Sequence, residues 1–200
     1  ALEGLLKVHA RYRKRVIITD SVFSMDGDCA SLQEIVELAN RYKCLIMIDE
    51  AHALGVWGDK GKGLASHWGV EDKIDIQMGT LSKAAGSFGA YCCGSGKLID
   101  FLINKSRSFI YTTGLPPGVA AASLKGIEII EQGELLRKQL WANARHVRGE
   151  IKRLGFDALE GESPIIPLMV NDSAIALRVS KDLLALGIFV AAIRTPTVPV

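Results

Sequence analysis

The chain has 200 residues, of which 48% are hydrophobic and 23% are charged, as in an ordinary globular protein. This length is enough for one large domain with its own core, or for parts of two domains. With 24 basic against 22 acidic residues, the formal net charge is +2. Such a balanced charge gives no reason to expect nucleic acid or a membrane surface as a partner.

The sequence contains no apolar run long enough to cross a bilayer and no secretory signal pattern. The four cysteines are Cys29, Cys44, Cys92 and Cys93, and they form no C-x-x-C pair and no metal-binding Cys/His spacing. We therefore expect buried free thiols in a cytoplasmic protein, and no metal site. The chain starts inside a helix-like stretch and ends in a Pro-punctuated segment, so we expect a fragment of a longer protein.

The first half of the chain predicts a strand, a helix and a second strand. β-Branched and apolar runs at 16–19 and 44–48 read as buried strands. Between them, apolar residues recur at helical spacing up to position 42, and Ser31 with Glu34 forms a capping box at the start of this helix. Two strands joined by a helix are expected to pair in parallel.

The next stretch predicts two more strands, at 74–78 and 88–93, after a Gly-rich loop at 55–63. Helical patterns dominate from 97 to 154, with an interruption near 114–117. Pro117 suits the first turn of the helix that follows, because proline has no amide hydrogen to leave unpaired there.

The last part of the chain predicts a strand, a helix and a strand, at 165–170, 173–186 and 188–193. Pro167 marks the first of these strands as an edge strand, since proline cannot donate to a ladder. We therefore expect an α/β protein with a mostly parallel sheet. Residues 1–130 belong to its large domain, and residues 131–200 to a smaller C-terminal α+β domain.

Polar side chains follow three of the predicted strands. They are Ser24 after the first strand, Asp49 and His52 after the second, and Thr80, Ser82 and Lys83 after the third. The carboxyl ends of parallel strands meet at one edge of a sheet, where ligands bind in α/β proteins. Each of these residues taken alone is more often structural, and only their occurrence together points to a site.

This set of side chains suits pyridoxal phosphate. A buried Asp beside a pyridine nitrogen keeps that nitrogen protonated, so that the ring can take up electrons. A lysine in a dry cationic pocket has a lowered pKa and can form an imine. Hydroxyl groups at Thr80 and Ser82, beside a glycine turn, suit a phosphate ester.

Two nucleotide-binding readings are disfavoured. The run 49–52 spells the DEAH box of helicases, but no G-x-x-x-x-G-K-[ST] loop precedes it, and the partial match at 94–97 follows it. The glycines at 58, 61 and 63 do not form G-x-G-x-x-G after a strand, so a dinucleotide site is not expected either.

The sequence resembles a known family, the α-oxoamine synthases, which are fold-type I pyridoxal-phosphate enzymes of the aspartate aminotransferase-like fold. The matching motifs lie in order at 21–28, 48–52, 79–84 and 110–117, and a further match lies at 192–199. Thr195 departs from the proline expected in that last motif. The resemblance covers nearly the whole chain.

The resemblance implies a role for each polar residue of the predicted site. Lys83 would hold pyridoxal 5′-phosphate as a Schiff base and later move the Cα proton. Asp49 would pair with the ring nitrogen, while His52 and Ser24 would bind the ring's 3-oxygen. Thr80 would bind the phosphate.

Residues outside this group also receive implied roles. Thr112 or Thr113 would reach the phosphate of a neighbouring subunit's cofactor, because the family's active sites lie at a homodimer interface. Thr197 would lie near the substrate. An aromatic residue that stacks on the ring and a substrate-binding arginine are implied outside the chain, before Ala1 and after Val200.

The implied activity is a decarboxylating condensation of an amino acid with an acyl thioester. The motif at 86–91 and the tail favour the family member that joins L-alanine to a pimeloyl thioester, on coenzyme A or a carrier protein, in biotin biosynthesis. Two alternatives stay open: a glycine-using synthase, and a catalytically incomplete subunit of the same fold. The presence of Lys83 argues against the second.

Overall fold

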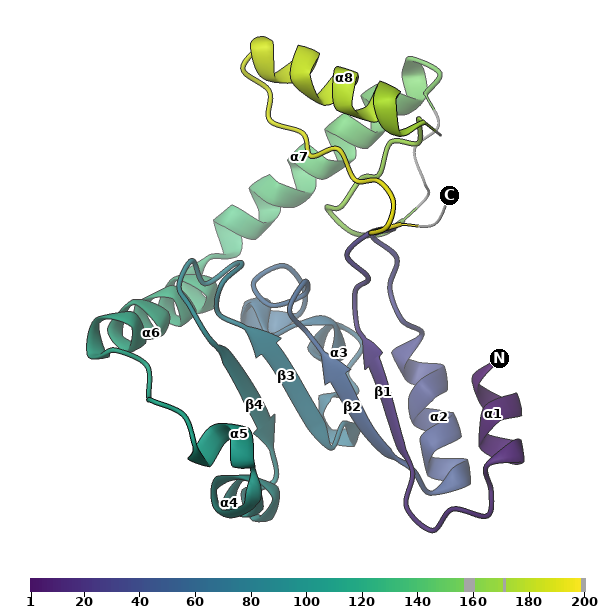
Figure 1. Cartoon of the computed structure of the whole chain (residues 1–200), viewed down its shortest axis with the longest axis vertical. Helices are drawn as coiled ribbons and strands as arrows, with labels where there is room; N and C mark the ends of the chain where they lie inside the picture. Colours follow the sequence, from purple (N-terminus) through teal and green to yellow (C-terminus); the bar gives the residue numbers. More distant parts are fainter. Residues whose placement is uncertain (157–160, 171, 199–200) are drawn as a thin grey trace.

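The computed structural model describes residues 1–156, 161–170 and 172–198, and its centre is a four-stranded sheet (Figure 1). The strands are β1 (Val16–Asp20), β2 (Leu45–Asp49), β3 (Ile76–Thr80) and β4 (Ala90–Gly94), and they lie in this order across the sheet. β1, β2 and β3 are parallel, and β4 is antiparallel to β3. The mostly parallel α/β sheet is confirmed.

The register of the parallel strands brings their carboxyl ends level with one another. Asp20 of β1 lies opposite Asp49 of β2, and Asp49 in turn lies opposite Met78 of β3. The polar residues that follow β1, β2 and β3 therefore lie at one edge of the sheet, which is the upper edge in Figure 1.

Helix α2 (Leu32–Tyr42) connects β1 to β2 and confirms the predicted βαβ unit. It ends at Lys43, which adopts a left-handed conformation with φ of 52°. The predicted capping box is wrong, because the Ser31 side chain makes no capping hydrogen bond. The backbone of Ser31, with φ of −71° and ψ of 70°, departs from the extended conformation that is usual at a helix N-cap.

The hydrophobic core lies on the α2 side of the sheet. Ile46 and Ile48 of β2 are buried there, and so is Leu64 of the short helix α3 (Leu64–His67). Two single 3-10 turns, Asp59–Gly61 and Glu71–Lys73, flank α3. The buried positions alternate along β2, so one face of this strand carries the core.

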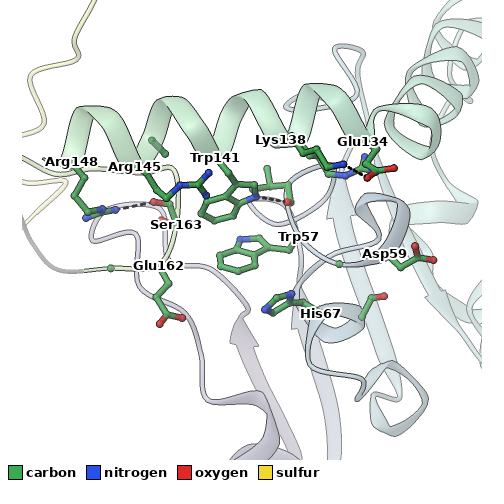
Figure 2. Close-up of a pocket in the computed structure, with 16 residues that line it drawn as sticks. Trp57, Asp59, His67, Glu134, Lys138, Trp141, Arg145, Arg148, Glu162 and Ser163 are labelled. Atoms are coloured by element: carbon green, nitrogen blue, oxygen red, sulfur yellow. Dashed lines mark hydrogen bonds and ion pairs between the residues drawn. The ribbon is translucent and has the colours of Figure 1, made fainter. Parts of the chain in front are cut away.

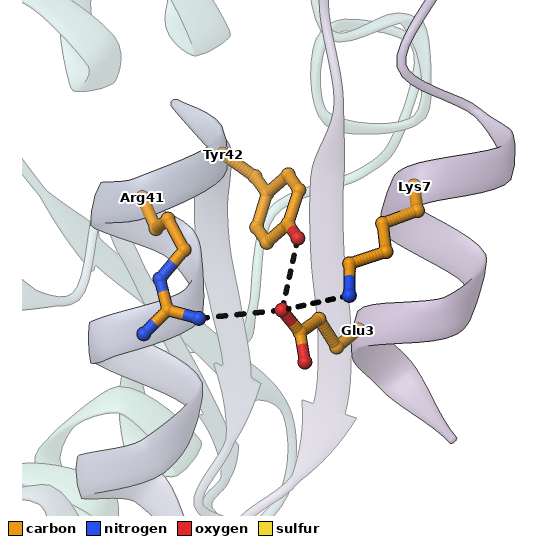
Figure 3. Close-up of polar contacts among 4 residues, drawn as sticks. All are labelled: Glu3, Lys7, Arg41 and Tyr42. Carbon is orange, nitrogen blue, oxygen red and sulfur yellow. Dashed lines mark hydrogen bonds and ion pairs between the residues drawn. The ribbon is translucent and has the colours of Figure 1, made fainter.

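Helix α1 (Leu2–Val8) is attached to the end of α2 by a polar cluster around Glu3 (Figure 3). The Glu3 carboxylate accepts hydrogen bonds from Tyr42 at 3.0 Å and Arg41 at 3.2 Å, and it pairs with Lys7 at 3.3 Å. The hydrogen bond from Tyr42, followed by the bond and charge of Lys7, lowers the pKa of Glu3. Exposed pairs of this kind contribute little stability, so Leu6, which is buried in the core, does more to hold α1.

Four helices follow β4: α4 (Gly96–Lys105), α5 (Arg107–Ile110), α6 (Pro117–Gln132) and α7 (Glu134–Arg153). The Ser95 hydroxyl caps α4 by accepting from the Leu98 amide at 3.3 Å, so the glycine-lysine run at 94–97 begins a helix rather than a phosphate loop. Pro117 lies in the first turn of α6, as predicted.

The C-terminal part contains α8 (Ser173–Ala185), which agrees with the predicted helix and is capped by the Asp172 side chain. The strands predicted at 165–170 and 188–193 are wrong, because in the part of the chain that the structure describes the first range has only a single β-bridge residue, Leu168, and the second has none. Apolar pattern alone does not make a strand, which also needs a neighbour to pair its amide and carbonyl groups. The domain boundary near residue 131 stays a prediction.

The cysteines are free, as expected, but the expectation that they are buried is wrong, because Cys29 and Cys44 are half-buried and Cys92 and Cys93 are exposed. Cys92 and Cys93 lie on β4, which has β3 as its single neighbour in the described sheet and so presents its other side to solvent. Among the residues that the structure describes, no helix is both long and apolar enough to span a membrane.

Truncating a core leucine should cost far more stability than truncating an exposed one. Leu64 is fully buried and Leu135 is 79% exposed. Leu64→Ala should lower the free energy of unfolding by roughly 2–5 kcal/mol, through lost apolar contacts and the cavity that remains. The control Leu135→Ala should change it by less than about 0.5 kcal/mol. Urea denaturation measures both, and equal losses would contradict this placement of the core.

Candidate functional site

The turn after β2 carries Asp49 and His52 at the upper edge of the sheet. The half-buried Asp49 carboxylate accepts a hydrogen bond from the Ala51 amide at 2.8 Å, which ties the side chain to the start of the turn. The amides of Ala53 and Leu54 both donate to the carbonyl of Glu50 at 2.9 Å. These bonds curl the backbone immediately after the strand, so that the strand end and His52 lie close together.

The electrostatics of His52 connect three of the predicted site residues. Partial burial, followed by the positive charge of Lys83, lowers the pKa of His52, while Asp20 and Asp49 act in the opposite direction. Lys83 and Asp49 thus both lie near enough to influence this imidazole. The structure brings Asp49, His52 and Lys83 into one electrostatic neighbourhood, and it adds Asp20, which sequence reasoning missed.

Two hydroxyl groups lie together after β3. The Thr80 and Ser82 hydroxyl oxygens are 2.7 Å apart, and Thr80 also bonds to the Gly89 carbonyl at 3.1 Å. This second bond links the two ends of the connection between β3 and β4. Thr80 also accepts from the Ser82 amide at 3.2 Å, so its hydroxyl is fully engaged, and the pair can donate to a bound group only when one hydroxyl turns away from its present acceptor.

Lys83 occupies the same connection, in a turn that is closed by a 2.9 Å bond from the Gly86 amide to the Lys83 carbonyl. Its side chain is exposed, so the expectation of a dry pocket around this lysine is wrong for the chain described here. Among the described residues, no carboxylate forms a salt bridge with the Lys83 amine.

Tyr91 of β4 is a further part of this region that sequence reasoning missed. Its ring lies across Gly79, where an added Cβ would come within 2.5 Å of the phenol oxygen. Burial, with smaller effects from Cys93, Glu50 and Asp49, raises the pKa of Tyr91 to about 12 and keeps the phenol neutral. The glycine that opens the 79–84 motif therefore makes room for a tyrosine on the neighbouring strand.

The remaining predicted residues make no hydrogen bond with this group in the part of the chain that the structure describes. Ser24 is half-buried in the segment after β1, and its hydroxyl bonds to no residue that the structure describes. Thr112 and Thr113 are exposed between α5 and α6, and α5 lies at the opposite end of the sheet from the carboxyl ends of β1–β3 (Figure 1). Thr197 is exposed near the C-terminus, where its amide donates to the Arg194 carbonyl at 3.0 Å.

A cavity of about 770 Å³ lies between the loop before α3, α7 and residues 161–163, and no predicted site residue lines it (Figure 2). Trp57 packs edge-on against Trp141 at 4.6 Å between ring centroids and against His67 at 5.0 Å. Trp141 also donates to the Val56 carbonyl at 3.2 Å. These contacts attach α7 to the sheet-bearing part of the chain, which gives the aromatic groups a structural role.

Comparison with known proteins gives the class of this protein. The family model described as aminotransferase class I and II matches residues 1–200, and the chain belongs to this family. Among curated relatives, 8-amino-7-oxononanoate synthase of Thermosipho melanesiensis is 46% identical over 198 residues, covering 99% of this chain and 51% of the relative. The same-named protein of Citrifermentans bemidjiense is 48% identical over 201 residues, covering 100% of this chain and 52% of the relative.

Solved structures agree with this class. Serine palmitoyltransferase of Sphingomonas wittichii superimposes with a TM-score of 0.92 at 30% identity, covering 99% of this chain and 50% of that one. 8-Amino-7-oxononanoate synthase of Francisella tularensis superimposes with a TM-score of 0.82 at 28% identity, covering 98% of this chain and 58% of that one. Both are α-oxoamine synthases, so the resemblance seen in the motifs is confirmed. The chain spans about half the length of the curated relatives it matches.

The lowered pKa of His52 predicts a pH dependence of stability with a definite sign. The pKa of His52 has its ordinary value of 6.5 in the unfolded chain and a lower value in the folded chain. At pH values between these two pKa values, the unfolded state therefore binds more protons than the folded state. The free energy of unfolding should therefore fall as the pH drops below about 6.5.

His52→Gln should lose less stability on acidification than the wild type. Urea denaturation at about pH 7.5 and about pH 5 measures this difference. His9→Gln, at the exposed end of α1, is the control and should follow the wild type. If His52→Gln also follows the wild type, the imidazole does not titrate as described.

Proposed function

We propose that this chain is part of an enzyme that uses pyridoxal phosphate to condense L-alanine with a pimeloyl thioester. The products are 8-amino-7-oxononanoate, carbon dioxide and the free thiol. The observation that carries the proposal is the 46–48% identity over almost the whole chain to relatives named 8-amino-7-oxononanoate synthase. The grouping of Asp49, His52 and Lys83 around one edge of the sheet supports it.

The residues at this edge fit pyridoxal phosphate in chemical type. The Asp49 carboxylate can pair with a protonated ring nitrogen, and an imidazole that is neutral at pH 7, such as His52, can hydrogen-bond the ring's hydroxyl oxygen. The hydroxyl pair of Thr80 and Ser82 can bind a phosphate ester. When bound, the cofactor withdraws electrons from the Cα of an attached amino acid.

Lys83 has two tasks in this proposal. Its amine would hold the cofactor through the aldehyde carbon, and as a free amine it would take the Cα proton of the substrate amino acid. An amine with no ion-pair partner among the described residues is suited to both tasks, because no carboxylate has to be displaced first. Proton transfer of this kind typically contributes about 10²–10⁴-fold to the rate.

We further propose that the enzyme acts as a cytoplasmic homodimer with shared sites. Thr112 and Thr113 are exposed in the connection after α5, and α5 itself lies at the end of the sheet away from the carboxyl ends of β1–β3, which supports a contact with another subunit's cofactor. Exposed aromatic side chains lie nearby in the chain, at Phe101 on α4, Phe109 on α5 and Tyr111 directly after α5. Ser24 and Thr197 are proposed to contact the cofactor and the substrate, respectively.

Alanine and a pimeloyl group are proposed over glycine and a short acyl group. The support is the name of the relatives and the motifs at 86–91 and 192–199. The last residue of the second motif, Pro199, lies outside the described residues. Serine palmitoyltransferase superimposes with a TM-score of 0.92, against 0.82 for the 8-amino-7-oxononanoate synthase of Francisella tularensis, so the fold alone does not select the substrate pair.

Borohydride reduction of the full-length protein with pyridoxal phosphate should fix the cofactor to Lys83. Peptide mass spectrometry should find the reduced adduct on that lysine. Lys83→Ala should abolish the adduct and lower the turnover rate at least about 100-fold. Lys73→Ala, an exposed lysine in the turn before β3, should retain both. An adduct on another lysine would show that the assignment of Lys83 is mistaken.

A substrate comparison tests the reaction itself. Full-length protein with L-alanine and pimeloyl-coenzyme A should release carbon dioxide and coenzyme A, and should form 8-amino-7-oxononanoate, detected by mass spectrometry. The same protein with glycine and acetyl-coenzyme A should be at least about tenfold less efficient, because pocket contacts to added methylene groups discriminate by this order. The reverse preference would identify a glycine-using synthase instead.

A further inference from the structure

Glu50 is a buried carboxylate that none of the roles above employs. It lies between Asp49 and His52 in the chain and is 1% exposed. One carboxylate oxygen accepts from the Ser21 hydroxyl at 2.7 Å and from the Leu64 amide at 3.0 Å, and the other accepts from the Ala65 amide at 2.9 Å. Three donors from two distant segments therefore converge on one side chain.

The backbone of Glu50 is held as firmly as its side chain. Its amide donates to the Met78 carbonyl of β3 at 2.7 Å, and its carbonyl accepts the two amides that close the turn around His52. Ser21 contributes a second link, since its amide and its hydroxyl both donate to the Asp49 carbonyl, at 2.9 Å and 3.1 Å. Glu50 thus connects the segment after β1, the turn after β2 and the end of β3.

The loop before α3 is shaped to bring its amides to this carboxylate. Gly63 has φ of 123°, a conformation that side-chain-bearing residues rarely adopt. A Cβ at this position would lie 2.7 Å from the carboxyl carbon of Glu50. The glycine therefore allows the amides of Leu64 and Ala65 to face the carboxylate, which an alanine there would obstruct.

We propose that Glu50 is a positioning residue, whose carboxylate sets the placement of Asp49 and His52 relative to the loop around them. This inference rests on the proposed function, because it concerns how those two residues meet pyridoxal phosphate. Glu50 touches no reacting atom. It holds the end of β2 and the following turn in one arrangement. Asp49 and His52 are then already positioned to bind the cofactor's ring nitrogen and hydroxyl oxygen.

Glu50→Gln is the most informative substitution, because glutamine keeps the shape of the side chain and replaces one acceptor oxygen with an NH2 group. The amide group of Glu50→Gln would turn two hydrogens toward positions where Ser21, Leu64 and Ala65 already supply donors. At least one buried backbone amide would lose its partner. Ser21→Ala is a milder variant, since it removes only the hydroxyl shared between Glu50 and the Asp49 carbonyl.

The test measures pyridoxal phosphate affinity and the circular dichroism of the bound cofactor's absorption band in the full-length protein, at a temperature where every variant is folded. Glu50→Gln should weaken cofactor binding by about tenfold, equivalent to about 1.4 kcal/mol, and should change the dichroism of the band. Ser21→Ala should change both in the same direction by a smaller factor. Thermal unfolding is recorded alongside.

Leu6→Ala is the matched control, because it destabilises the core at α1 without touching the Glu50 network. It should lower the melting temperature while leaving cofactor affinity and dichroism at the wild-type values. If Glu50→Gln does not fold, Ser21→Ala decides the question. Wild-type affinity and dichroism in the folded variants would overturn the positioning role, whereas a wild-type protein that binds no pyridoxal phosphate would overturn the proposed function itself.

Discussion

The parallel pairing of β1, β2 and β3 is the constraint on which the site depends. Parallel strands in this register end at the same edge, so residues that are 29 positions apart in the chain, Asp20 and Asp49, become neighbours. The turn after β2 then adds His52, and the connection after β3 adds Thr80 and Lys83. If neighbouring strands were antiparallel, these groups would lie at different ends of the sheet.

A second layer of interactions fixes how the residues meet at that edge. The buried carboxylate of Glu50 accepts bonds from the segment after β1 and from the loop before α3, and its backbone bonds to β3. Gly63 and Gly79 leave room for Glu50 and Tyr91, respectively. The candidate site is therefore bordered by residues to which we assign no chemical step, and the two glycines leave the space that these side chains occupy.

Much of the large-domain fold could be predicted because its signals are local. The apolar runs of β1 and β2 and the helical spacing of α2 identify these elements without tertiary knowledge, and Pro117 marks the start of α6. The predicted strands at 165–170 and 188–193 failed because a strand is defined by its partner, which no local pattern supplies. The capping box failed because the backbone at Ser31 does not present its hydroxyl to the helix.

The sequence by itself determined the βαβ order and the family motifs, and it predicted Asp49, His52 and Lys83 as site residues, since these follow from residue types and their spacing. Only the tertiary structure decided that Glu50 and Tyr91 belong to the same region, that Lys83 is exposed in this chain, and that Thr112 and Thr113 are exposed in the connection between α5 and α6. The physical reason is that burial, pKa and contact between distant segments depend on which surfaces pack together, and spacing along the chain does not contain that information.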